Sequence, residues 1–258
     1  MIVASCQFAV TGDITVNLDC MERFIAQASK QGAQLLLFPE CALSGYPPYD
    51  LKSASEANFD ALTAAEERMA QLAKDFQMVL VFGTITKDST GIHNSAVLCF
   101  PDGRKSIYHK RALWGWDRDH FAAGTSPCVF RLDDFTIGVS ICFEIRFPEF
   151  FRELYANRTD LNLVLFYDRT DKPDMDRYEL IKSHIRTRAV ENTAYLLTSD
   201  TIFPYQSAPT MLCDRSGRIL EELKRNEPGL LLYDLKKTPL DFGEQGRREI
   251  SDWLTGHH

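Results

Sequence analysis

The chain has 258 residues, of which 45% are hydrophobic and 25% are charged, an ordinary globular composition with enough length for a sizeable core. Its net charge is −7, and Lys and Arg are scattered rather than grouped into a basic stripe, which argues against nucleic acid and acidic membranes as partners. No segment approaches the ~20 apolar residues of a membrane span, and the N-terminus lacks a signal-peptide pattern, so we expect a cytoplasmic protein that acts on small molecules.

The cysteines and histidines follow neither disulfide nor metal-binding patterns. The seven cysteines are widely spread and never spaced as C-x-x-C, which argues against a disulfide framework and a structural zinc site. The six histidines form no H-x-x-x-H or similar motif, so a metal-dependent hydrolase has little support. We therefore expect no metal and no cofactor.

The first half of the chain opens as strand, helix, strand. Alternation over residues 2–9 predicts a strand, apolar residues at helical spacing predict a helix from Val16 to the break at Gln31-Gly32, and the apolar run QLLLFPE predicts a strand buried on both faces. The elements predicted next are a helix at 54–75, a strand at 78–85, and two strands at 95–100 and 105–109 that flank the turn Pro101-Asp102-Gly103.

The second half repeats this pattern without an obvious sequence repeat. Its predicted elements are strands at 127–131 and 135–141, a helix from 148 to about 156, a strand at 161–167, a helix at 175–192, the strand AYLLTS and the hairpin TMLCDRSGRIL. Strands that alternate with helices and hairpins predict an α/β protein with mixed sheets covered by helices. We expect a single domain over 1–258, with a tail from about 236 that packs on a neighbouring element or a partner subunit.

Three buried-looking runs end in a reactive group, at Glu40, Lys110 and Cys142. In α/β sheets such groups collect where the strands open into loops, because the strand fixes the position and the loop leaves room for a substrate. A nucleophilic thiol needs a base or a cation nearby, and Glu40 and Lys110 supply these. Taken singly, Cys142 fits a packing residue, Glu40 a solvated loop carboxylate and Lys110 an exposed turn residue. Their joint placement favours a catalytic site.

Three blocks resemble the signature blocks of the nitrilase superfamily of carbon-nitrogen hydrolases, in its amidase-like branch: LLLFPECALSGYPPYDL, YHKRALW and GVSICFEIRFPEFFREL. GTI at 83–85 with HNSAVL, AAG at 122–124 and RTRAVENTAYL at 186–196 also fit the pattern of that family in the expected order. The resemblance covers the chain from the first strand to about residue 235. It implies a four-layer αββα sandwich of two mixed sheets flanked by helices, which usually forms homodimers or higher homo-oligomers.

The resemblance also implies a Glu-Lys-Cys triad. Glu40 corresponds to the general base, Lys110 to the cation that stabilises the tetrahedral intermediate, and Cys142 to the nucleophile. The oxyanion would lie between Lys110 and the backbone N–H of Phe143. Attack on an amide then expels ammonia or an amine and leaves a thioester that water hydrolyses, without a metal or cofactor.

The segment after Lys110 departs from the family pattern. Many members carry a second glutamate there, and the position in register with it is Asp117, with Asp119 the less favoured candidate. We expect Asp117 to serve in a loop that is correspondingly shorter. Glu144 follows the nucleophile at a place where relatives often carry an acidic residue, and we assign it a supporting role.

Aromatic residues and one polar loop are the candidates for substrate contact. We place Tyr46, Trp114 and Tyr167 near the pocket, with core packing as the alternative. The loop 168–171 is charged where relatives often carry small residues, and it either lines the pocket or points outward. His109 precedes Lys110 on a strand, so its side chain is expected on the opposite face.

The predicted activity is hydrolysis of a small amide, of the ω-amidase or N-carbamoyl amidase type. The block LSGYPPYDL is also similar to the glutaminase part of glutamine-dependent NAD synthetases, which raises glutamine-like amides as substrates. The alternatives are nitrile hydrolysis by the same site and a non-catalytic binding or scaffold member of the fold.

Overall fold

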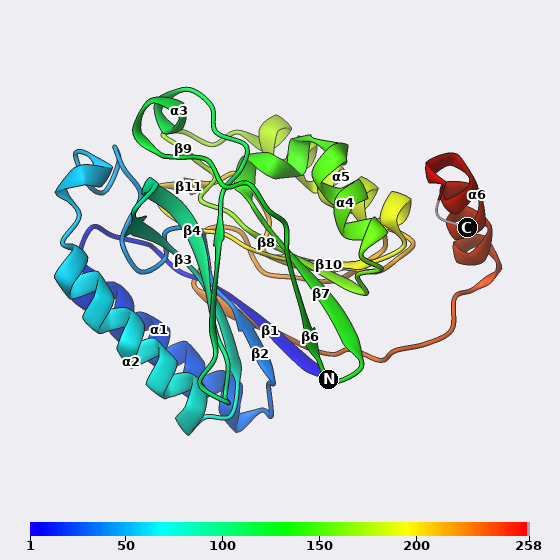
Figure 1. The fold of residues 1–258 in the computed structure, drawn as a ribbon, viewed down its shortest axis with the longest axis horizontal. Coiled ribbons are helices and arrows are strands. Elements are labelled where there is room, and N and C mark those ends of the chain that lie inside the picture. The colour runs from blue at the N-terminus through cyan, green and yellow to red at the C-terminus, as the bar shows by residue number, and fades with distance from the viewer. Residues whose placement is uncertain (257–258) are drawn as a thin grey trace.

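The computed structural model describes residues 1–256 and has two six-stranded mixed sheets packed face to face, with helices on both outer faces (Figure 1). The first sheet consists, in spatial order, of β14 (Gly229–Asp234), β1 (Ile2–Gln7), β2 (Leu35–Leu37), β3 (Val79–Asp88), β4 (Gly91–Cys99) and β5 (Lys105–His109). The second consists of β13 (Ile219–Glu222), β12 (Met211–Cys213), β10 (Tyr195–Ser199), β8 (Leu161–Leu165), β7 (Phe135–Ile141) and β6 (Cys128–Leu132). In each sheet three central strands are parallel and the outer ones antiparallel, so the halves that share a sequence pattern also share a topology.

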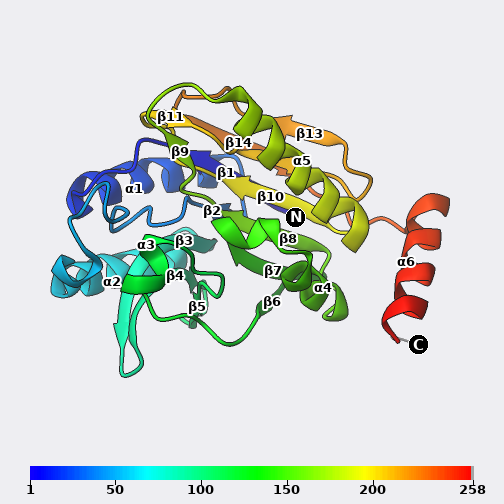
Figure 2. The ribbon, with the colours of Figure 1, turned by 90° about the horizontal axis from the view of Figure 1, so that it is seen from above.

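Helices cover the two outer faces and complete the four layers (Figure 2). The helices α1 (Ile14–Lys30) and α2 (Phe59–Asp75) pack on the first sheet, and α4 (Pro148–Ala156) and α5 (Met175–Asn192) pack on the second. Smaller elements are the 3₁₀ turns η1 (Ala54–Glu56) and η2 (Cys142–Arg146), the helix α3 (Trp116–His120), and the ribbon of β9 (Arg169–Thr170) and β11 (Tyr205–Gln206). The predicted αββα sandwich of two mixed sheets is confirmed.

Three separate hydrophobic cores explain the layering. Along β2, Leu35 and Leu37 point into the core between the sheets, whereas Leu36 packs against the layer of α1 and α2. This alternation follows from the two-residue period of a strand, and all three side chains are fully buried. A strand that is covered on both faces has a continuous apolar sequence, as the LLL of β2 does.

Two details of the predicted elements are wrong. The apolar face of α1 is formed by Met21, Phe24 and Ile25, whereas Val16 is 50% exposed. The helix predicted at 54–75 is divided into η1 and α2, because Asn58 caps α2 by accepting a hydrogen bond from the backbone N–H of Ala61 at 3.1 Å. A cap side chain competes with a continuous helix and starts a new one.

The C-terminal helix α6 (Phe242–Thr255) stands at one end of the sandwich, beyond an extended segment (Figure 1). Asp252 accepts hydrogen bonds from Tyr155 at 2.5 Å and Arg158 at 2.7 Å, and Glu244 pairs with Arg215 at 2.9 Å. Polar contacts of this kind attach the helix by one side. Among residues 1–256, no helix is long and apolar enough to cross a membrane.

Candidate active site

The structure brings Glu40, Lys110 and Cys142 together at one end of the sandwich. Lys110 directly follows β5, Cys142 directly follows β7, and Glu40 lies three residues after β2. A pocket of about 210 Å³ opens over this position, lined among others by Lys110, Cys142, Asp117 and Phe143. The proximity that the three strand ends suggested in the sequence is therefore present.

Both oxygens of the Glu40 carboxylate are held by donors from different parts of the chain. Oε1 accepts hydrogen bonds from Nδ2 of Asn94 at 2.7 Å and Nζ of Lys110 at 2.8 Å, and Oε2 accepts the backbone N–H of Tyr167 at 2.9 Å. The side chain is 1% exposed. Three donors around this buried carboxylate fix its orientation.

Lys110 lies between two carboxylates. Its Nζ is 2.8 Å from an oxygen of Glu40 and 2.8 Å from Oδ2 of Asp117, and its side chain is 3% exposed. Burial alone lowers the pKa of the ammonium, but the charge of Glu40, with a further contribution from Asp117, raises the pKa well above its ordinary value. Lys110 is therefore positively charged at neutral pH. Asp117, at the start of α3, also accepts the Tyr46 hydroxyl at 2.5 Å.

Cys142 is the first residue of the 3₁₀ turn η2, directly after β7. Its φ of +44° lies in the left-handed region, where a residue with a Cβ is strained, and such strain is characteristic of functional turns. Burial raises the pKa of the thiol well above its ordinary value, and the nearby Glu40 carboxylate raises it further, against an opposing effect of Lys110. The resting side chain is a neutral thiol that faces the pocket.

Glu144 is fully buried, and its carboxylate binds backbone N–H groups instead of forming an ion pair with a charged side chain. Its carboxylate accepts the N–H groups of Arg111 and Ile141, each at 2.7 Å, and the hydroxyl of Tyr108 at 2.8 Å. Arg111 follows Lys110, and Ile141 precedes Cys142. Burial raises the pKa of Glu144, and the two backbone N–H groups oppose that shift. One carboxylate thus links the segments that carry the ammonium and the thiol.

Three tyrosines form one wall of the pocket. The rings of Tyr46 and Tyr167 stack with centroids 4.8 Å apart, and Tyr49 stacks on both, at 6.3 Å and 6.4 Å. The sequence placed Tyr46 and Tyr167 here but missed Tyr49, although the spacing in YPPYD was an available signal. Trp114 also lines the pocket and is 67% exposed, which places it at the rim.

The polar loop after β8 contributes to the pocket, which answers the question left open by the sequence. Asp168 and Arg169 both line it. Arg177, which the sequence did not suggest, reaches in from α5 and forms a two-point ion pair with Asp168, at 2.7 Å and 2.9 Å. No short sequence motif indicates Arg177, because its ion pair with Asp168 joins residues that lie nine positions apart, one in a loop and the other in a helix.

His109 points away from the site, as the strand period predicts. Its Nδ1 is 2.8 Å from the hydroxyl oxygen of Ser95, and its ring stacks on that of His93 with centroids 3.9 Å apart. Asp88 lies within 3.5 Å of both rings. Asp88 of β3, His93 of β4 and His109 of β5, which no sequence motif groups, thus come together as three side chains that could hold a metal ion. His257 and His258 lie outside the described residues.

Two glycines in the motifs GTI and AAG lie where backbones approach closely. A Cβ on Gly83 would lie 2.5 Å from Cα of Glu40, and one on Gly124 would lie 2.2 Å from the carbonyl oxygen of His109. The backbone positions of Glu40 and of the segment that carries Lys110 therefore require glycine at these two places. Asn94 of HNSAVL completes this set, because its amide donates to Glu40.

Comparison with known proteins is consistent with this geometry. The family model described as carbon-nitrogen hydrolase matches residues 2–238. A deaminated glutathione amidase from Synechocystis sp. is 29% identical, with 91% of each chain covered, and a nitrilase from Pyrococcus abyssi is 32% identical, covering 72% of this chain and 69% of the relative. An amidase from Nesterenkonia sp. AN1, in a mutant that shows Michael addition of acrylamide at the active-site cysteine, superposes with a TM-score of 0.80 at 28% identity, covering 98% of this chain and 99% of the other.

Proposed function

Because the chain belongs to the carbon-nitrogen hydrolase family, we propose that it hydrolyses a small amide through a thioester formed on Cys142. One observation carries the proposal. The Lys110 ammonium is held by the carboxylates of Glu40 and Asp117, each at 2.8 Å, beside the partly buried Cys142 thiol in one small pocket. A base, a cation and a nucleophile are the components that attack on an unreactive amide requires.

The first step in this mechanism joins proton transfer to attack. The Cys142 thiol is neutral at rest, because burial and the charge of Glu40 raise its pKa. Glu40 accepts the thiol proton as the sulfur forms a bond to the amide carbon, and the carbonyl π electrons move onto oxygen. Keeping the thiol neutral until a substrate binds avoids an isolated thiolate next to Glu40.

The oxyanion of the tetrahedral intermediate is stabilised by two donors. These are the ammonium of Lys110 and the backbone N–H of Phe143, which lies at the start of η2, where an N–H has no partner within the helix. Loss of one such donor raises the barrier by about 3 kcal/mol. Glu144 is a positioning residue in this scheme, because it holds the backbone beside both groups.

The second half-reaction releases both products. Glu40 returns its proton to the amide nitrogen, the C–N bond breaks, and ammonia or an amine leaves a thioester on Cys142. Glu40 then removes a proton from a water molecule that attacks the thioester carbon, and collapse of that intermediate returns the proton to sulfur and releases the carboxylic acid. Each proton that Glu40 accepts is passed on within the cycle.

The test combines product release with detection of the intermediate. Purified enzyme is mixed with a panel of small ω-amides, N-carbamoyl compounds and nitriles, and ammonia release and intact mass are measured. We expect an acyl adduct on the wild type that is absent in Cys142→Ala. Absence of an adduct and of ammonia with every compound would support instead the non-catalytic binding or scaffold alternative.

Nitrile hydrolysis is the second candidate, and the 32% identity to a nitrilase from Pyrococcus abyssi favours keeping it in the panel. The same thiol can add to a nitrile carbon, and the same carboxylate can supply the proton to nitrogen. Amide hydrolysis is preferred because two of the relatives reported above are named as amidases.

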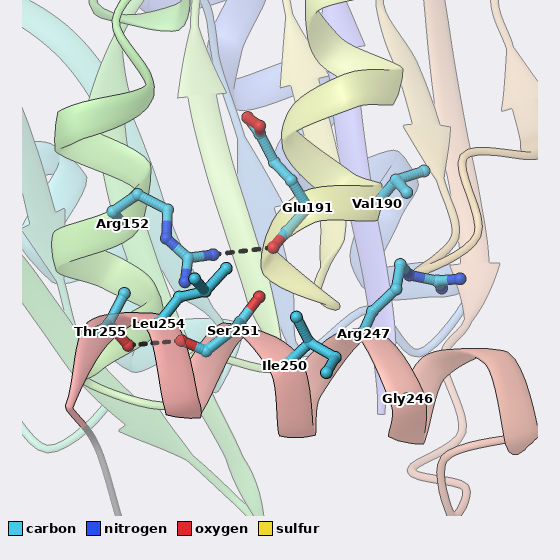
Figure 3. Close-up of a pocket in the computed structure, with 9 residues that line it drawn as sticks. All are labelled: Arg152, Val190, Glu191, Gly246, Arg247, Ile250, Ser251, Leu254 and Thr255. Atoms are coloured by element: carbon cyan, nitrogen blue, oxygen red, sulfur yellow. Dashed lines mark hydrogen bonds between the residues drawn. The ribbon is translucent and has the colours of Figure 1, made fainter.

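We also propose that the chain is one hydrolase domain that forms a homodimer through its C-terminal tail. α6 contacts the rest of the chain through polar groups such as Glu244 and Asp252, whereas four of its large apolar side chains are exposed: Phe242 at 94%, Ile250 at 58%, Trp253 at 67% and Leu254 at 69%. Two of them, Ile250 and Leu254, line a groove of about 670 Å³ that α6 forms with Arg152 of α4 and the C-terminal end of α5 (Figure 3). Large apolar side chains gathered on one helix face are characteristic of an interface, and a second copy supplies an identical face.

A further inference from the structure

The side chain of Arg169 lines the pocket and has no role in the proposed reaction. Its guanidinium lies over the ring of Tyr49 at 4.1 Å and near that of Tyr167 at 6.0 Å. Its Nε is buried and has no hydrogen-bond partner, and the side chain forms no ion pair within residues 1–256. A buried donor without a partner is unfavourable, so this arrangement calls for an acceptor supplied from outside the chain.

The neighbouring charges of the pocket are already paired, which isolates Arg169. Arg177 is neutralised by the two oxygens of Asp168, and Asp168 is also held by the hydroxyl of Ser207 at 2.6 Å. Asp50, on the other side of Tyr167, accepts the hydroxyl of that tyrosine at 2.6 Å and forms no ion pair with Arg169 in the part of the chain that the structure describes. The carboxylates nearby are thus committed to other partners.

The geometry of Arg169 suits a planar anion. Stacking on Tyr49 covers one face of the guanidinium and leaves its edge N–H groups available, and that edge matches the two oxygens of a carboxylate. The backbone is fixed as well, because Arg169 pairs with Gln206 in the ribbon of β9 and β11. A rigid element with a free guanidinium edge is a built recognition site rather than a flexible surface cation.

We infer that Arg169 forms a carboxylate subsite, so that the substrate is a small amide with a carboxylate at the end opposite the scissile bond. The inference rests on the proposed amide hydrolysis. The pocket is small, about 210 Å³, which suits a short chain between the two ends. The neutral end reacts at Cys142, and the charged end pairs with Arg169.

The experiment compares two probes of nearly the same shape, succinamate and succinamide, which differ in the charge at the far end. We expect the wild type to prefer succinamate in kcat/KM, and Arg169→Met to lower that preference by about 10- to 100-fold, mainly through KM, as expected for loss of a charge-assisted contact. Arg169→Lys should recover part of the preference. Arg118→Met is the matched control: Arg118 lies over Trp114 at 5.3 Å but does not line the pocket, and its removal should leave the ratio unchanged.

Two outcomes would overturn the subsite: a wild type with no preference for the charged probe, and an equal fall of the ratio in Arg118→Met and Arg169→Met. Both leave amide hydrolysis itself in place. If neither amide is hydrolysed, the panel described above decides the proposed function, and calorimetric titration of Cys142→Ala with succinate tests the subsite separately. Binding that Arg169→Met abolishes in that background would support a carboxylate site, and binding unaffected by it would exclude one.

Discussion

The buried carboxylate of Glu144 accepts the backbone N–H of Arg111 at 2.7 Å, across a gap of 33 residues in the chain. Because it also accepts the N–H of Ile141, Glu144 ties the segment after Lys110 to the segment before Cys142. The cation and the nucleophile are therefore positioned relative to each other by a residue that lies in neither β5 nor β7.

This link predicts the effect of Glu144→Gln. The substitution preserves shape but places an amide N–H₂ group among backbone N–H donors, so at least one donor loses its partner, at a cost of about 1–3 kcal/mol. We expect thermal unfolding at a lower temperature and kcat reduced by at least about tenfold, with KM changed less. A variant with normal kcat would show that the link has no positioning role. Glu153→Gln is the control, because Glu153 contacts Arg111 only through its guanidinium, at 2.6 Å.

Asp117→Asn is expected to lower kcat by about 100-fold or more. The change removes one of the two carboxylates that hold Lys110 and leaves the Tyr46 hydroxyl with a neutral acceptor. Asp117→Glu restores the charge with one extra methylene and should recover part of the activity. Steady-state kinetics of the two variants measure this, and unchanged kcat in Asp117→Asn would remove the residue from the site.

The raised pKa of Cys142 predicts the pH dependence of its reactivity in the free enzyme. A higher pKa favours the protonated form of an acid, so the thiol stays neutral through pH 7 and up to at least its ordinary pKa of ~8.5. The rate of modification by 2,2′-dithiodipyridine, taken as the difference between wild type and Cys142→Ser, should rise with pH without levelling off in the neutral range. A plateau near neutral pH would indicate a resting thiolate and contradict the concerted first step.

Gly83→Ala is expected to destabilise the fold and to reduce turnover. An added Cβ would lie 2.2 Å from the backbone N of Cys41 and 2.5 Å from Cα of Glu40, so the segment that carries Glu40 must move. Displacements of this size commonly cost about 1–3 kcal/mol. Gly243→Ala in α6 is the control, because its Cβ meets only an ordinary contact of 3.5 Å and alanine favours a helix. Equal melting temperatures for both variants would contradict the close approach at Gly83.

Trp253→Arg is expected to convert the proposed dimer to a monomer, because it places a charge on the apolar face of α6. Light scattering coupled to gel filtration measures the mass directly. Gln245→Arg is the matched control, since it adds the same charge to an exposed position of the same helix outside that face. A wild-type protein that is monomeric at all concentrations, or a dimer that persists in Trp253→Arg, would exclude this interface.

The sequence by itself determined the α/β class of this protein and three residues of its candidate site. Strand and helix periods are local, so they predicted mixed sheets covered by helices, whereas the four-layer αββα order was implied by the resemblance to the nitrilase superfamily. Glu40, Lys110 and Cys142 could be predicted to meet because each ends a buried-looking apolar run in the sequence. Tertiary structure alone decided that Glu144 holds backbone at two distant positions, that Asp168 takes Arg177 as its partner, and that Arg169 is left with a free edge. These outcomes depend on which side chains the fold places within hydrogen-bond distance of a buried donor or acceptor. The partners come from segments that can lie far apart in the chain, and residue spacing along the sequence does not tell which of them will be in contact.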